Sequence, residues 1–213
     1  MVDNIVAYEE KTVSKFVKVI VGLFILGTVL MGYNFHLSYE LTFISNSFCG
    51  LLLLLDGIVG LLKKKELSTT LYQLVLPCIM TVFFTTVFQL FGWHSFNFSG
   101  MFFFMHAINP VVFLLMYLFL TKLEISNKAD YIRRIFVAPV MIMAYALFDL
   151  IRFIITGDLV YGLIAVEHLN FVSVPLIGIG LYFLMAFMSY GLLDLKLFVQ
   201  KKTRKKVASC KKF

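Results

Sequence analysis

Residues 41–65 read LTFISNSFCGLLLLLDGIVGLLKKK. A helix that crosses about 30 Å of hydrocarbon at about 1.5 Å per residue needs roughly 20 predominantly apolar residues. Residues 41–62 have that length, and Asp56 is the single charged residue among them. This stretch therefore predicts a transmembrane helix, and Lys63–Lys65 mark the end of the helix that stays in the cytosol.

The rest of the chain repeats this pattern. Of its 213 residues 61% are hydrophobic, and the mean hydropathy is +0.92, so a soluble domain of this length could not bury so much apolar surface. We therefore expect an all-α polytopic bundle of six transmembrane helices, which forms a single membrane domain over residues 1–213 and ends in a basic cytosolic tail at residues 199–213. The six predicted spans are residues 16–33, 41–62, 71–91, 101–120, 135–156 and 174–198.

Positive charges predict the orientation, because Lys and Arg near the ends of a span resist translocation. All 19 basic residues except Arg152 lie before or at the start of the first span, after the second, between the fourth and fifth, or around and beyond the end of the sixth. Both termini should therefore face the cytosol, in a multi-pass protein of the cell membrane. Anionic lipid accounts for the basic tail, so we expect no nucleic-acid partner.

The sequence offers no cofactor site. It has no Gly-rich phosphate loop, and its cysteines have no spacing typical of metal ligands. His36, His94 and His168 belong in or beside the outer loops, but they lack the short local spacing of a known metal motif. We therefore expect neither a cofactor nor a metal, and the sequence leaves the oligomeric state open.

The predicted orientation brings polar residues of three spans to a similar depth. The second and fourth spans descend from outside, so Thr42 opens one of them and His106 lies about five residues, roughly 8 Å, below the start of the other. The fifth span rises toward the same side. Lipid offers polar groups no partners, so such residues face the bundle interior and often mark function. The polar cluster comprises Thr42, Ser45, Asn46, His106, Asn109, Asp149 and Arg152.

A hydroxyl beside an imidazole is the minimal pair for nucleophilic hydrolysis, because a base must remove the proton of a weak nucleophile. Thr42 and His106 are the candidates for nucleophile and base. Asp149 or Asn109 could orient the imidazole, and other members of the cluster could hold an oxyanion or a substrate carboxylate. The candidates for these supporting roles are Asn46, Asn109, Asp149 and Arg152.

Other interpretations of the same residues stay open. Thr42 could be a helix N-cap, His106 a hydrogen-bonding residue between helices, and Asp149 with Arg152 an ion pair within one helix. Asp56 could pair with another helix or belong to a proton path. Functions of another class are a lipid-binding or proton-coupled carrier, and an interaction subunit.

Three short motifs carry a resemblance to a known family. They are Leu41–Asn46 at the start of the second span, His106–Pro110 in the fourth, and Ala144–Arg152 with the Thr156–Gly157 turn in the fifth. They resemble motifs of bacterial six-span membrane proteins related to the androgen-induced and androgen-dependent TFPI-regulating proteins. The resemblance extends from about Lys15 to Lys196.

This resemblance implies an activity. Animal members of the family are threonine hydrolases that cleave fatty acid esters of hydroxy fatty acids, and by position their nucleophile and base fall on Thr42 and His106. Met105 differs from the polar residue expected before the histidine. We therefore expect an integral membrane hydrolase of a lipid-like ester, with an amphiphilic acyl substrate that enters from membrane lipid near the extracytoplasmic side.

Overall fold

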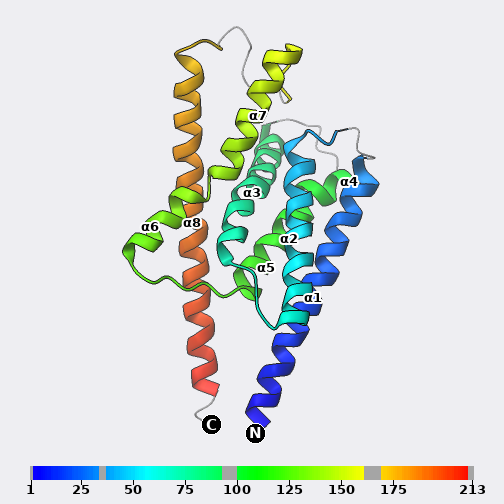
Figure 1. Cartoon of the computed structure of the whole chain (residues 1–213), viewed down its shortest axis with the longest axis vertical. Coiled ribbons are helices and arrows are strands. Elements are labelled where there is room, and N and C mark those ends of the chain that lie inside the picture. The colour runs from blue at the N-terminus through cyan, green and yellow to red at the C-terminus, as the bar shows by residue number, and fades with distance from the viewer. Residues whose placement is uncertain (1, 34–36, 93–99, 161–168, 211–213) are drawn as a thin grey trace. The chain divides into compact units, whose positions relative to one another are not determined.

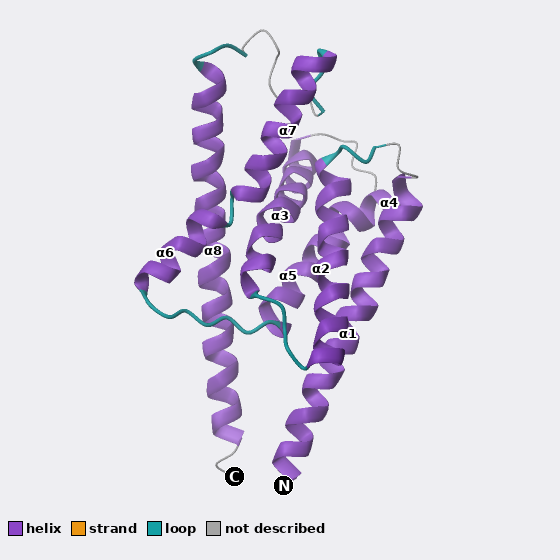
Figure 2. Ribbon diagram, viewed as in Figure 1, coloured by secondary structure: helices purple, strands orange, loops and turns teal. Residues whose placement is uncertain are grey.

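The computed structural model is helical, with six helices that are long and apolar enough to cross a membrane. It describes residues 2–33, 37–92, 100–160 and 169–210, and no strand occurs in these ranges (Figure 2). The all-α fold with six potential spans is therefore confirmed. The six spans lie within Thr12–Gly32, Leu41–Lys63, Thr69–Phe88, Gly100–Leu120, Lys128–Thr156 and Ser173–Thr203.

The chain forms two compact units, which we call unit 1 (Met1–Lys122) and unit 2 (Leu123–Phe213). The fourth span of unit 1 is irregular, because a π-helical turn interrupts it. The helices of unit 1 are α1 (Val2–Tyr33), α2 (Leu41–Lys63), α3 (Thr69–Gly92), α4 (Gly100–Phe103), the π-helical turn η1 (Phe104–Ile108) and α5 (Asn109–Leu120).

Helices α1 and α2 lie side by side with their backbones in close contact (Figure 1). A Cβ atom added to Gly22 of α1 would lie 2.6 Å from the Leu54 nitrogen and 2.8 Å from the Gly50 oxygen. One added to Gly57 of α2 would lie 2.8 Å from the Lys15 oxygen. Small residues at such contacts let membrane helices approach closely. A close approach stabilises the pair because dispersion contacts, rather than the hydrophobic effect, hold helices together in lipid.

A buried ion pair lies in the C-terminal part of α2, and its contacts link three helices. Asp56 and Lys18 are each 1% exposed, and the Lys18 ammonium lies 2.8 Å from the Asp56 Oδ2 atom. The Tyr72 hydroxyl donates to the same oxygen at 2.6 Å, and the Leu67 N–H donates to Oδ1 at 2.6 Å. Asp56 therefore pairs with another helix, and it also holds the α2–α3 connection, which satisfies a carboxylate that burial would otherwise strongly destabilise.

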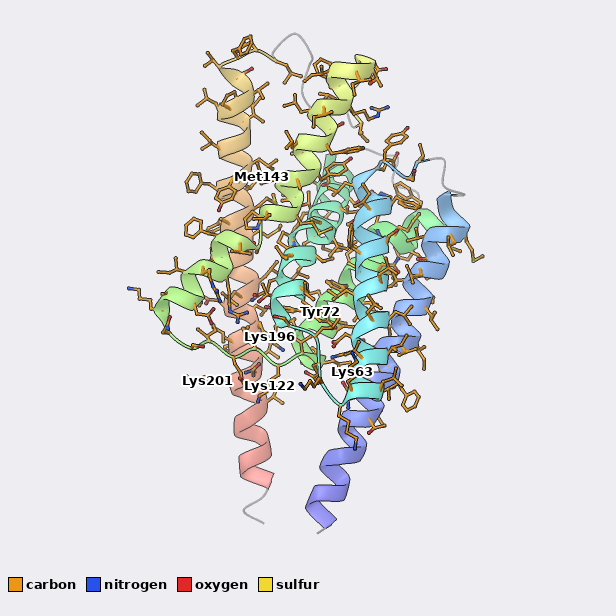
Figure 3. The ribbon with its side chains drawn as sticks, viewed as in Figure 1. Lys63, Tyr72, Lys122, Met143, Lys196 and Lys201 are labelled. Carbon is orange, nitrogen blue, oxygen red and sulfur yellow. The ribbon has the colours of Figure 1, made fainter. Side chains whose placement is uncertain are left out.

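The basic residues of unit 1 gather at this end. Lys63 closes α2, Lys122 follows α5, and both lie toward the same end of the unit as the N-terminal half of α1 (Figure 3). Thr42, in the first turn of α2, lies at the opposite end. The helix directions within unit 1 therefore agree with the charge pattern, and the orientation in the membrane stays a prediction.

Unit 2 contains α6 (Lys128–Val137), α7 (Val140–Thr156) and α8 (Ser173–Cys210). The predicted span 135–156 is therefore the second part of a longer helical stretch that begins at Lys128 and is interrupted at Pro139, which lacks a backbone N–H. Asn127 caps the stretch by accepting from the Asp130 N–H at 2.9 Å. The tail from residue 199 onward continues α8 as far as Cys210.

Candidate active site

Thr42 and His106 lie next to each other in unit 1. The Thr42 Oγ1 atom is 3.3 Å from the His106 Nε2 atom, although the two residues are far apart in the sequence. Thr42 is 3% exposed and lies inside α2, whose N-cap residue is Glu40. Thr42 is therefore not the cap of its helix, and its hydroxyl has the position that a nucleophile needs beside a base.

The other imidazole nitrogen is held by the backbone. His106 Nδ1 lies 2.8 Å from the carbonyl oxygen of Phe102, one helical turn earlier, and the imidazole stacks on the Phe102 ring at a centroid distance of 3.9 Å. A carbonyl only accepts, so Nδ1 must carry the hydrogen. In the neutral ring, Nε2 then keeps its lone pair and directs it toward the Thr42 hydroxyl.

The Phe102 carbonyl thus makes the contact with Nδ1 for which Asp149 and Asn109 were the candidates. No side-chain signal could have revealed it, because every residue carries the same carbonyl. The sequence shows only that an aromatic residue stands four positions before His106, a spacing at which two side chains of a helix can meet.

The π-helical turn leaves the Met105 carbonyl without its α-helical partner. The Asn109 N–H donates to the Phe104 oxygen five residues back, whereas a regular α-helix would direct it to Met105. The next residue, Pro110, has no N–H to offer. The Met105 oxygen instead accepts a hydrogen bond from Asn46 Nδ2 at 3.1 Å, so α2 supplies the partner that the turn lacks.

Asn46 belongs to a buried chain of hydrogen bonds across three helical segments. Its Nδ2 also donates to the Thr42 oxygen at 2.8 Å, and its Oδ1 accepts from Asn109 Nδ2 at 2.8 Å. Asn109 Nδ2 donates in addition to Thr28 Oγ1 on α1, again at 2.8 Å. Thr28 was missed from the sequence, although a threonine inside an apolar span is a recognisable signal.

This chain changes the roles expected for the two asparagines. Both amide hydrogens of Asn46 point to backbone carbonyls, and those of Asn109 point to Thr28 and Asn46, so neither amide is directed at an oxyanion. Asn109 is fully buried, and its Oδ1 has no hydrogen-bond partner among the described residues. That oxygen is therefore able to accept a hydrogen bond from a donor outside the described residues, such as a water molecule or a ligand.

Asp149 and Arg152 belong to unit 2. The Asp149 Oδ1 atom accepts from the Val160 N–H at 2.9 Å, and Arg152 Nη1 donates to the Asp158 oxygen at 2.9 Å. Gly157, which lies between Arg152 and Asp158, turns the chain with a φ of 82°, a conformation that favours glycine. Both side chains thus hold the turn that follows α7, and their part in a site with Thr42 and His106 stays a prediction.

His36, His94 and His168 lie outside the described residues. Within the described ranges, no group of three or more His, Cys, Asp or Glu side chains could hold a metal ion. Comparison of the chain with protein-family models, with curated proteins and with solved structures finds no match. The resemblance to the androgen-induced and androgen-dependent TFPI-regulating proteins therefore stays an expectation.

Proposed function

We propose that the protein is an integral membrane hydrolase of a lipid-like ester, with Thr42 as the nucleophile and His106 as the base. One observation supports this most strongly: Thr42 Oγ1 lies 3.3 Å from Nε2 of an imidazole whose Nδ1 is tied to a carbonyl. The Nδ1 contact leaves the lone pair of the neutral ring on Nε2. The two contacts together give a proton acceptor that faces a hydroxyl.

The reaction would run in two steps. His106 Nε2 takes the hydroxyl proton as Thr42 Oγ1 attacks the ester carbonyl, and it returns that proton to the departing alkoxide, so an alcohol leaves and an acyl-threonine forms. A water molecule then attacks the acyl group while Nε2 accepts its proton. The proton passes back to Thr42 Oγ1, and a carboxylic acid is released. The Phe102 carbonyl stabilises the positive imidazolium in both steps.

The surroundings favour an apolar substrate. Thr42 is 3% exposed, so a substrate carbonyl would approach past the half-buried His106. Phe102, stacked on the imidazole, is 39% exposed and borders that path. Because the charge pattern puts this end of α2 on the extracytoplasmic side, the acyl chain would enter from the outer leaflet.

A fluorophosphonate probe tests the proposal on the purified protein in nanodiscs. We expect the wild type to form an adduct that peptide mass spectrometry maps to Thr42. The isosteric variant Thr42→Val should form no adduct at this position, because it lacks the hydroxyl. The variant His106→Gln should label at least about a hundredfold more slowly, which is the usual range for removal of a general base. Thr81→Ala is the matched control, because the Thr81 hydroxyl bonds the Pro77 carbonyl of its own helix.

Two results would contradict the proposal. One is an unlabelled wild type that is folded and monodisperse. The other is unchanged labelling of Thr42→Val and His106→Gln. The carrier remains the alternative function, and substrate-driven proton uptake into vesicles that Thr42→Val leaves unchanged would favour it.

A further inference from the structure

The distance between Thr42 and His106 depends on an irregular piece of backbone. His106 lies in the π-helical turn η1, where the Asn109 N–H bonds the Phe104 oxygen instead of the Met105 oxygen. A π-helical turn accommodates one residue more than an α-helical turn, is rare, and is frequently found at functional sites. It persists only if something stabilises it against the regular helix.

The regular helix is the close competitor. If the Asn109 N–H moved back to the Met105 oxygen, the residues before the turn would rotate by about 100° relative to α5, the angle that one residue occupies in an α-helix. Such a rotation would carry the imidazole off the Thr42 hydroxyl. The π-helical turn therefore determines whether the imidazole of the proposed base faces the Thr42 hydroxyl.

Asn46 stabilises the turn from the outside. Its Nδ2 donates to the Met105 oxygen at 3.1 Å and to the Thr42 oxygen at 2.8 Å, so one amide holds the backbone of the base-bearing turn and that of the nucleophile. Asn46 is fully buried. In an apolar medium without water, a carbonyl that lost this partner would recapture the Asn109 N–H, the donor that a regular α-helix would direct to it.

The amide of Asn46 is itself fixed in orientation. Its Oδ1 accepts from Asn109 Nδ2, and the second hydrogen of that group goes to Thr28 on α1. The Thr28 hydroxyl donates to the Ile25 oxygen at 2.7 Å, so its oxygen is left to accept from Asn109. The donors and acceptors match only with Nδ2 of Asn46 facing the two carbonyls.

From this geometry we infer that Asn46 is a positioning residue of the hydrolase: it locks the π-helical turn so that His106 Nε2 faces Thr42 Oγ1. The inference rests on the proposed function. It assigns Asn46 no contact with the substrate, and it makes Asn109 and Thr28 the supports that keep the Asn46 amide in place.

The test compares Asn46→Leu, which keeps the side-chain volume and removes the amide, with Cys49→Ala. Cys49 is the matched control because it is as fully buried as Asn46, lies three residues further along α2, and has no role in the proposed site. Two quantities are measured on the full chain in nanodiscs. They are the rate of fluorophosphonate labelling and the ring nitrogen shifts of ¹⁵N-histidine, assigned with His106→Gln and recorded at a pH where the ring is neutral.

We expect wild type and Cys49→Ala to keep the His106 proton on Nδ1 and to label at similar rates. Asn46→Leu should show a mixture of tautomers and label about a hundredfold more slowly, the loss typical of a misplaced catalytic group. If Asn46→Leu does not give monodisperse protein, Asn46→Ala removes the same amide without added bulk, and the same results are expected of it.

The outcomes separate the two claims. A folded wild type that does not label contradicts the hydrolase, whatever the tautomer. A wild type that labels, beside an Asn46 variant that is folded, labels equally fast and keeps the wild-type ring shifts, overturns the positioning role. A change of tautomer with the loss of labelling supports it, because a general loss of stability would not move the ring proton of a folded protein.

Discussion

The pairing of Lys18 with Asp56 shows how single residues are constrained in this protein. Both are 1% exposed, and the carboxylate also accepts from Tyr72 and Leu67. Removal of one partner from such a pair leaves an uncompensated charge that costs about 3–5 kcal/mol, whereas replacement of both by apolar residues costs far less.

Lys18→Met should therefore destabilise the protein strongly, and the double variant Lys18→Met with Asp56→Leu should recover part of the loss. The measurement is the midpoint of thermal unfolding in detergent, with the exposed Lys63→Met as the control. Equal midpoints for wild type and Lys18→Met would contradict the interpretation of this pair as a stabilising contact.

At the residue scale, the sequence predicted side-chain partners better than backbone partners. The proximity of Thr42 and His106 could be predicted, because the charge pattern indicated the direction of two spans and the depth of each residue followed from that direction. The Phe102 and Met105 carbonyls could not, since a carbonyl has no residue-type signal. Only Pro110, which withholds an N–H, hinted that the backbone nearby needs outside partners.

Helix α1 meets α2 through glycines, and this contact determines how a substitution acts on the element. A methyl group on Gly22 would meet backbone atoms of α2 at 2.6 and 2.8 Å, whereas one on Gly27 of the same helix would find nothing within 4 Å. Backbone cannot give way as a flexible side chain can. The same substitution should thus have opposite effects at the two positions.

We expect Gly22→Ala to lower stability by about 1–3 kcal/mol, the usual cost of overpacking. Gly27→Ala should be neutral or should raise stability by up to about 1 kcal/mol, because alanine favours the helix. Thermal unfolding of both variants under identical detergent conditions measures the difference. A Gly22→Ala protein as stable as Gly27→Ala would contradict the close approach of α1 and α2.

At the element scale, hydropathy located the spans but not all of their ends. The stretch from Lys128 to Arg134 is polar and fell outside the apolar window, yet it is helical and capped by Asn127. The cap residue and Asp130 in the first turn were visible in the sequence as a helix start. The π-helical turn had no comparable signal, because it follows from hydrogen bonds to α2 rather than from local preference.

The distribution of charge makes a prediction about the whole molecule. Lys63–Lys65 follow one end of α2, and Thr42 lies at the other. If the positive residues face the cytosol, the loop before α2 is extracellular, the loop after it is cytosolic, and the proposed site belongs to the extracytoplasmic half.

Cysteine labelling in intact cells tests this orientation. We expect Ser38→Cys, before α2, to react with a membrane-impermeant maleimide added outside. Glu66→Cys, after α2, should react only once the membrane is permeabilised, and both variants carry Cys210→Ser so that the introduced cysteine is read alone. The native Cys49 and Cys78 are fully buried inside helices, so they give little background.

The reverse pattern would do more than invert the topology. It would put the Thr42 hydroxyl and His106 in the cytosolic half while leaving their 3.3 Å separation untouched, because that distance is internal to unit 1. The chemistry proposed for the pair would survive, but its substrate would come from the inner leaflet. Labelling from outside therefore decides which lipid pool the site can reach, and the fluorophosphonate adduct decides whether the site reacts at all.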